Sequence, residues 1–175
     1  LHSLRRRQRQ MCIRDRATDK IIELGDLVTI DFGYYVNGYT SDVTRTIAMG
    51  TISDELREVY AVVKQANENA IDIVKPGISG SEIDSVAREY ITNHGFGEFY
   101  NHSTGHGVGL DIHEGPALSS RSSDEMQSGH LLTIEPGIYL PGKGGVRIED
   151  DVIVTSDGYE NLTEGITKSL VIIEG

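Results

Sequence analysis

Apolar residues recur along the chain with two different periods, and each period predicts its own kind of element. Residues 53–74 carry them at the spacing of one helix face, and Pro76-Gly77 ends that segment. A second helix follows, because Ser79 and Glu82 form a capping-box pattern and Gly95 is typical of a helix end. We expect both apolar faces to pack into one core.

Shorter segments have the composition and alternation of strands. They are expected at residues 27–31, 40–49, 131–135, 146–155 and 170–173, with a turn at Asp157-Gly158. Strands, two helices and then more strands indicate an α+β domain with a mainly antiparallel sheet.

The first two strands are joined by Asn37-Gly38, a strong signal for a type I′ hairpin turn because both turn positions need positive φ. That turn pairs Asp31 with Thr44. Side chains alternate along a strand, so Asp42 becomes the diagonal neighbour of Asp31 on the same face. The sequence therefore predicts two carboxylates close together on one hairpin.

Charge is spread unevenly along the 175 residues. Of 16 basic and 27 acidic residues, residues 1–16 hold six arginines and one aspartate, so the remainder carries a net charge of −16. A body that acidic does not bind nucleic acid through general electrostatics. The basic segment fits a nucleic-acid arm, a localisation patch or sequence foreign to the domain; its lack of helical or strand periodicity favours the last, and we expect it to be disordered.

Five residues offer metal-binding chemistry: Asp31, Asp42, His106, Glu135 and Glu149. The acids lie on predicted strands and His106 lies in a glycine-rich turn. Taken singly, an acid on a strand is usually solvated and a lone histidine is usually structural. Here, however, Asp31 and Glu135 end apolar runs, where a carboxylate is costly unless it is paired or bound to a metal. Oxygen ligands with one imidazole favour manganese, cobalt, iron or zinc over copper.

These residues lie in four blocks that resemble the signatures of the pita-bread metallopeptidases, in the family's order. The blocks are residues 31–46, 102–114, 133–139 and 145–151. The resemblance covers residues 17–175 and implies the pita-bread (creatinase/aminopeptidase) fold, with a curved antiparallel sheet and flanking helices. Four matching motifs are far more specific than any single motif.

The family resemblance implies a role for each matching position. Asp31 would bind one of two divalent ions, Asp42 and Glu149 would bridge both, and His106 and Glu135 would bind the second. Glu135 would also help to deprotonate the water. The catalytic and substrate-contacting residues would further include His102, His113 and Arg147. The cofactors implied are two divalent ions, manganese or cobalt first, with zinc or iron as alternatives.

Two features select a branch of the family. His102 lies four residues before His106, and Leu110-Asp111 precede His113. Both features resemble the Xaa-Pro dipeptidases and aminopeptidases P. The implied partner is a short proline-containing peptide, hydrolysed at the bond before proline. Two alternatives remain: a non-catalytic relative that binds peptides or proteins, and a methionine aminopeptidase.

The resemblance fails at the start of the chain. The family carries an earlier helix and strand and a Pro-His-Gly segment before Ala17, whereas Arg14 stands here in place of that histidine. We therefore expect residues 17–175 to be a partial catalytic domain that is incomplete at its N-terminus. A single cysteine, Cys12, and the lack of a long apolar run favour a cytoplasmic location without a membrane partner, and a homodimer is an assembly to test.

Overall fold

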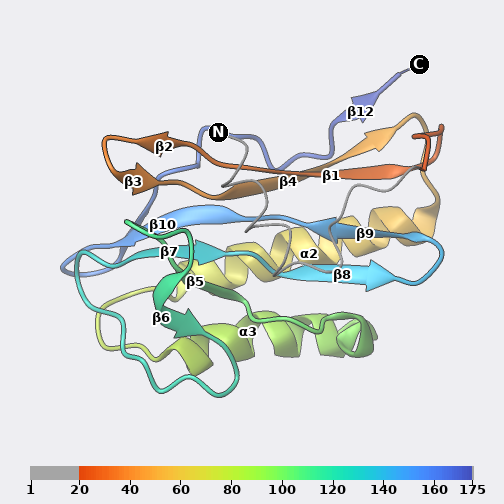
Figure 1. The fold of residues 1–175 in the computed structure, drawn as a ribbon. Helices are drawn as coiled ribbons and strands as arrows, with labels where there is room; N and C mark the ends of the chain where they lie inside the picture. Colours follow the sequence, from red (N-terminus) through yellow and green to blue (C-terminus); the bar gives the residue numbers. More distant parts are fainter. Residues whose placement is uncertain (1–19, 175) are drawn as a thin grey trace.

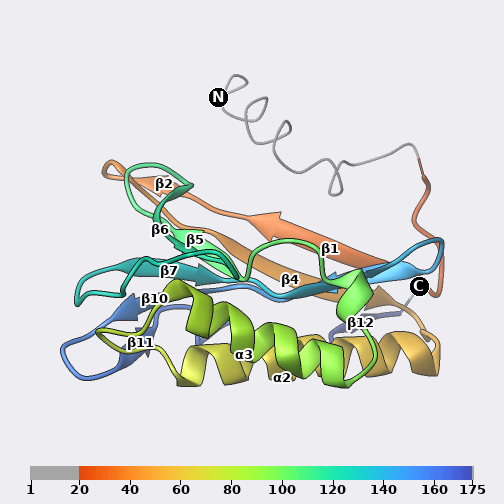
Figure 2. The same cartoon turned by 90° about the horizontal axis from the view of Figure 1, so that it is seen from below.

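The structure is a computed structural model that describes residues 20–174 (Figure 1). The predictions for the basic segment 1–16 and for Arg14 lie outside the described residues. Two helices, α2 (Asp54–Asp72) and α3 (Gly80–Asn93), lie side by side on one face of the strands, as Figure 2 shows. None of the described helices is both long enough and apolar enough to cross a membrane.

Most strand pairs in the described chain are antiparallel. The strands are β1 (Leu27–Phe32), β2 (Tyr35–Val36), β3 (Tyr39–Thr40), β4 (Val43–Met49), β5 (Gly105–Gly107), β6 (Glu114–Leu118), β7 (Leu131–Ile134), β8 (Gly137–Leu140), β9 (Gly144–Arg147), β10 (Asp150–Val154), β11 (Tyr159–Asn161) and β12 (Ile172–Ile173). They form sheets in the orders β1-β4-β12 and β11-β10-β7-β5-β6 and the two pairs β2-β3 and β8-β9. Only β12, which pairs with β4, is parallel to its neighbour among these.

The hairpin register is confirmed, since Asp31 pairs with Thr44. Asn37 and Gly38 have φ values of 51° and 93°, as the predicted turn requires. The prediction of one return strand over residues 40–49 is wrong in one respect, because the strand is interrupted after Thr40 and β4 begins only at Val43. Gly33 allows this break, because a Cβ at Gly33 would lie 1.9 Å from the carbonyl oxygen of Ser41.

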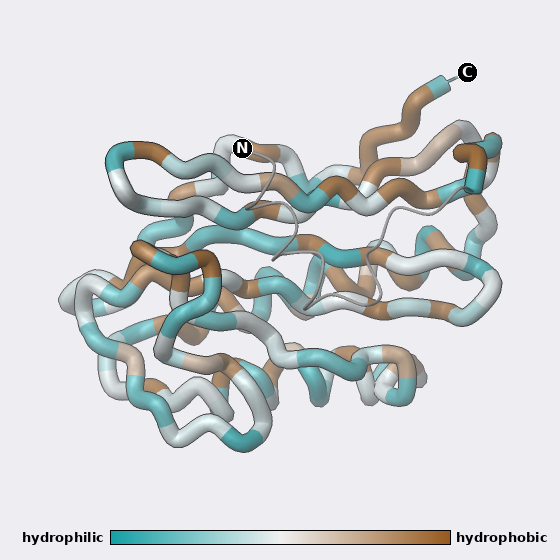
Figure 3. The backbone as a smooth tube through the Cα atoms, viewed as in Figure 1, coloured by the Kyte–Doolittle hydropathy of each residue, from teal (hydrophilic) through white to brown (hydrophobic). Residues whose placement is uncertain are grey.

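Both helices form where the sequence predicts them. The Ser53 side chain caps α2 by accepting a hydrogen bond from the Leu56 N–H, and Ser79 and Glu82 make the full capping box of α3. Gly95, with φ of 84°, follows the C-terminal end of α3. Figure 3, in which hydrophobic residues are brown, shows such residues recurring along the helices and sheets.

The main core lies between the two helices and the strands that follow them. Its fully buried side chains include Val59, Val63, Ile83, Ile91, Leu118, Leu132, Ile134, Ile138, Ile148 and Val152. Burying side chains of this size contributes about 1.5–3 kcal/mol each. Ile134 and Ile148, the residues just before Glu135 and Glu149, belong to this buried core.

Candidate metal centre

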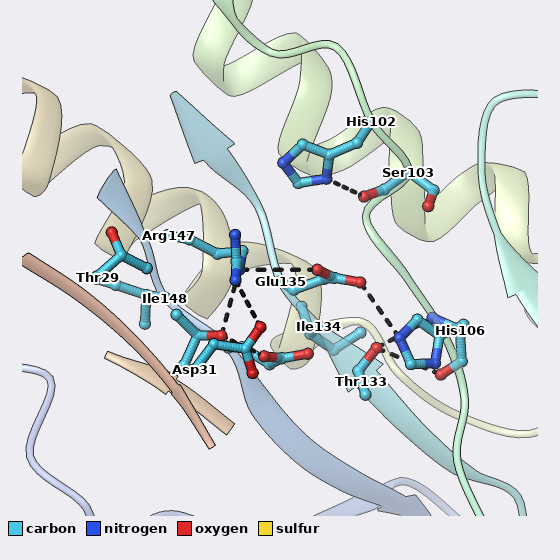
Figure 4. Close-up of polar contacts among 12 residues, drawn as sticks. Thr29, Asp31, His102, Ser103, His106, Thr133, Ile134, Glu135, Arg147 and Ile148 are labelled. Atoms are coloured by element: carbon cyan, nitrogen blue, oxygen red, sulfur yellow. Dashed lines mark hydrogen bonds and ion pairs between the residues drawn. The ribbon is translucent and has the colours of Figure 1, made fainter. Parts of the chain in front are cut away.

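The five predicted metal-binding residues meet in one cluster. Ligand atoms of Asp42, His106 and Glu149 all lie within 4.8 Å of one another. Asp31 lies next to Asp42, and its negative charge helps to raise the pKa of that carboxyl group. Glu135 lies beside His106, with Oε1 3.4 Å from the ring Nε2 (Figure 4). The structure thus places three of the residues around one position and the other two directly against them.

The local setting of these residues differs from the sequence-based expectation. His106 lies on strand β5, whereas the prediction put it in a turn. Asp42 immediately precedes β4, and Glu135 and Glu149 lie in the breaks that follow β7 and β9, whereas they were predicted within strands. Of the four acids, Asp31 alone lies within a strand. Both corrections have the same origin, because contacts from distant segments set these backbones.

The breaks at the two glutamates are supported by one buried side chain of α2. The Asn67 Nδ2 donates hydrogen bonds to the carbonyl oxygens of Ile134 at 2.8 Å and Ile148 at 3.4 Å. Each carbonyl belongs to the residue before a glutamate. Asn67 is completely buried, so it replaces the hydrogen bonds that an uninterrupted ladder would supply. Sequence reasoning missed this role, although a polar residue within the apolar face of a helix was a visible signal.

The orientation of the His106 ring suits a metal ligand. Its Nδ1 lies 3.0 Å from the carbonyl oxygen of Gly107, which can only accept a hydrogen bond, so Nδ1 carries the proton and Nε2 carries the lone pair. Nε2 faces Glu135. The His106 backbone N–H donates to Thr133 Oγ1 at 3.1 Å. β5 and β7 therefore fix the direction of the imidazole.

Burial makes the ionised form of the carboxyl groups costly. It raises the pKa of Asp42 to about 9, with the charge of Glu149 adding to the effect. Burial likewise raises the pKa of Glu149 to about 8, although a hydrogen bond from Thr44 opposes the shift. The pKa of Glu135 is raised by burial and then by Glu149. Burial lowers the pKa of His106 to about 4, which keeps the ring neutral. Such a site favours a bound cation, because a cation offsets the cost of ionising carboxyl groups that are buried beside one another.

Arg147 lies among the carboxylates. Its Nη2 is 2.8 Å from Asp31 Oδ2, and its Nε is 4.0 Å from Glu135 Oε2. Nε also donates to Thr44 Oγ1 at 3.2 Å, and Thr44 in turn donates to Glu149 Oε2 at 2.5 Å. One guanidinium does not balance four carboxylates, and the donor set of oxygens with one imidazole nitrogen fits divalent cations.

The two remaining predicted histidines lie on the rim of the cluster. The His113 ring centroid is 4.3 Å from that of His106. The His102 ring is 5.5 Å from the ring of Tyr139, whose hydroxyl accepts a hydrogen bond from Arg147 at 3.1 Å. His113 therefore lies against a proposed metal ligand, and His102 is linked to Arg147 through Tyr139.

Asp151 is a further buried acid that sequence reasoning missed. Its Oδ2 accepts the backbone N–H of Asp42 at 3.1 Å, and burial raises its pKa to about 6. Its position two residues after Glu149 was the available signal, because side chains two apart in an extended chain point to the same side. Asp151 holds the backbone of Asp42 in place.

Comparisons with known proteins identify a family and several relatives of this chain. A sequence profile of metallopeptidase family M24 matches residues 7–156. The chain is 50% identical over 157 residues to an uncharacterized peptidase, YqhT, of Bacillus subtilis, and 49% identical over 148 residues to a Xaa-Pro dipeptidase of Pyrococcus furiosus. These matches cover 90% and 85% of the chain but only 44% and 42% of the relatives, so the chain spans less than half of their length.

Solved structures give the same result. A Xaa-Pro dipeptidase from Bacillus anthracis superposes with a TM-score of 0.87 at 52% identity, covering 89% of this chain and 44% of that one. An X-Pro aminopeptidase from Thermotoga maritima gives 0.87 at 46% identity, covering 91% and 45%. The predicted α+β pita-bread fold is confirmed as a partial domain. The chain belongs to metallopeptidase family M24.

Proposed function

We propose that this chain carries the dinuclear metal centre of a peptidase that hydrolyses the bond before proline in dipeptides or short peptides. The observation that carries the proposal is the convergence of Asp42, His106 and Glu149, with Asp31 and Glu135 against them. The Xaa-Pro specificity named for the relatives supports the choice of substrate.

The residues fit two divalent ions. Asp42 and Glu149 would bridge them, Asp31 would bind one, and His106 and Glu135 would bind the other. The ions would be manganese or cobalt, with zinc or iron as alternatives. When bound, such ions lower the pKa of a shared water and polarise the scissile carbonyl. The negative charge of the ligand set matches this cofactor in sign.

The chain's own residues then handle the proton and the substrate. Glu135 accepts a proton from the attacking water and delivers it to the proline nitrogen as the peptide bond breaks. Its raised pKa suits a group that must hold that proton during the step. His113 donates a hydrogen bond to the oxygen on which negative charge develops. The Nδ1 of His102 donates to the carbonyl oxygen of Ser103 at 2.8 Å, so His102 donates to the same oxygen through Nε2 only in its doubly protonated form. Arg147 holds the Asp31 carboxylate through the contact at 2.8 Å.

Specificity for proline requires a site that accepts a tertiary amide. Because the scissile nitrogen has no hydrogen, selection depends on the shape around the proline ring and on the histidine contacts. Both the dipeptidase and the aminopeptidase reaction fit this arrangement. A cytoplasmic location and a homodimer complete the proposal.

The test is hydrolysis of Ala-Pro and of an Xaa-Pro tripeptide in the presence of Mn²⁺. Two proteins are compared: this chain, and a version extended upstream with the family's helix and Pro-His-Gly segment. We expect turnover in the extended version and a rate lower by about a hundred- to a thousand-fold in this chain, because Arg14 stands where the family has a charge-stabilising histidine. Equal turnover in both would refute the importance of the added segment. Metal binding without hydrolysis by either would favour the non-catalytic alternative.

A further inference from the structure

A buried ion pair on α3 contacts the segment that carries His102. The Asp84 carboxylate is completely buried and accepts two hydrogen bonds from Arg88, from Nε at 2.7 Å and from Nη2 at 2.8 Å. This two-point contact fixes the plane of the guanidinium, which a single-point contact does not do. Neither residue belongs to the proposed ligand set.

Both members of the pair hold the backbone of residues 100–104. Arg88 donates to the carbonyl oxygens of His102 at 2.8 Å and Tyr100 at 3.1 Å, and its guanidinium lies 4.3 Å from the centre of the Tyr100 ring. Asp84 Oδ1 accepts the Thr104 hydroxyl at 2.9 Å and the Thr104 N–H at 3.2 Å. Figure 4 shows His102 beside the green helix ribbon.

The same segment reaches Glu135 on the other side. The Thr104 carbonyl oxygen accepts the backbone N–H of Glu135 at 2.7 Å. Thr104 is completely buried, and its hydroxyl is 2.6 Å from that of Tyr100. A continuous set of hydrogen bonds therefore runs from α3 to the backbones of His102 and Glu135.

We propose that Asp84 and Arg88 are positioning residues that set the places of His102 and Glu135 relative to the carboxylate cluster. The catalytic roles of His102 and Glu135 rest on the proposed function. The claim that Asp84 and Arg88 set their positions does not depend on it. Their effect is indirect, through the main chain of residues 102–104. Small displacements of catalytic groups are costly, so such a support matters to the reaction.

Two variants test the inference. Arg88→Lys keeps the charge but loses the two-point contact, and Asp84→Asn keeps the shape but loses the charge. The matched control is Glu68→Gln on α2, which breaks the Lys64–Glu68 pair, also one turn apart but partly exposed at 3.6 Å. All proteins are compared by imidazole ¹H–¹³C NMR in chelator and by titration with Mn²⁺.

In both test variants we expect the His102 ring resonances to shift while those of His130 stay in place as a check of folding. We also expect Mn²⁺ affinity to fall by about 10- to 100-fold, the usual effect of losing an outer support of a ligand. The control should change neither. Folded variants with an unshifted His102 and unchanged Mn²⁺ affinity would overturn the inference. A wild-type chain that binds no Mn²⁺ would instead overturn the proposed function, and the His102 shifts would then decide the inference alone.

Discussion

Replacing Arg147 by methionine should destabilise the metal-free protein about twice as much as the metal-loaded protein. The Arg147 side chain is 4% exposed, and it pairs with Asp31, whose side chain is 44% exposed. Breaking a buried ion pair by removing one partner costs about 3–5 kcal/mol. Since Asp31 is partly solvated, we expect a loss of about 3 kcal/mol in chelator, at the low end of that range.

Bound divalent ions should reduce this loss, because they take over the neutralisation of the carboxylates. What remains is the loss of hydrogen bonds to Thr44 and Tyr139, about 1–2 kcal/mol. The difference of about 1.5 kcal/mol corresponds to roughly tenfold tighter metal binding by the variant. For a chain of this size, the loss in chelator lowers the melting temperature by about 6–12 °C.

The assay is urea denaturation with chelator and with saturating Mn²⁺. Arg45→Met is the control, because Arg45 is also buried but its carboxylate partner, Asp150 at 2.8 Å, lies outside the proposed ligand set. Its loss of stability should be similar in both conditions. If Arg147→Met lost the same free energy of unfolding with and without Mn²⁺, the electrostatic account of Arg147 would be refuted.

Three further predictions concern the same site. In chelator, the free energy of unfolding should fall from pH 6.5 to 9, because burial raises the pKa values of Asp42 and Glu149 to about 9 and 8. Over this range the native state releases protons that the unfolded chain has already lost. The lowered pKa of His106 affects stability only below pH 6.5, and a melting temperature that rises from pH 6.5 to 9 would contradict the prediction. Asp42→Asn should remove most of the rise in melting temperature that Mn²⁺ gives to the wild type, and an undiminished rise would exclude Asp42 as a bridging ligand. Gly105→Ala should destabilise the chain and weaken Mn²⁺ binding, because the new Cβ would lie 1.9 Å from the carbonyl oxygen of Thr133 beside His106; unchanged stability in thermal melts would show that β5 and β7 separate easily.

Features set by local sequence could be predicted. The Asn37-Gly38 turn determines the hairpin register, because its backbone conformation leaves one pairing of the flanking strands. The capping box of Ser79 and Glu82 likewise locates the start of α3, because these two side chains bind the backbone N–H groups of the first turn. The adjacency of Asp31 and Asp42 follows from that register, and the negative charge of Asp31 helps to raise the pKa of Asp42.

Features set by distant segments could not be predicted. The strand breaks at Glu135 and Glu149 depend on Asn67, which lies far earlier in the sequence and meets their preceding carbonyls only after α2 packs on the sheet. His106 lies between two glycines, which have low strand propensity, so the local pattern favoured a turn. Tertiary contact with β7 overrides that preference.

The central claim is that this chain forms a two-metal centre, and the number of ions bound tests it most directly. The chain is loaded with excess Mn²⁺ or Co²⁺, freed of unbound ions by gel filtration, and analysed for metal and protein content, with Asp42→Asn alongside. Two ions per wild-type chain and a clear deficit in the variant are the predicted result. A wild-type chain that retains neither ion, or that retains as much as Asp42→Asn, would contradict the account.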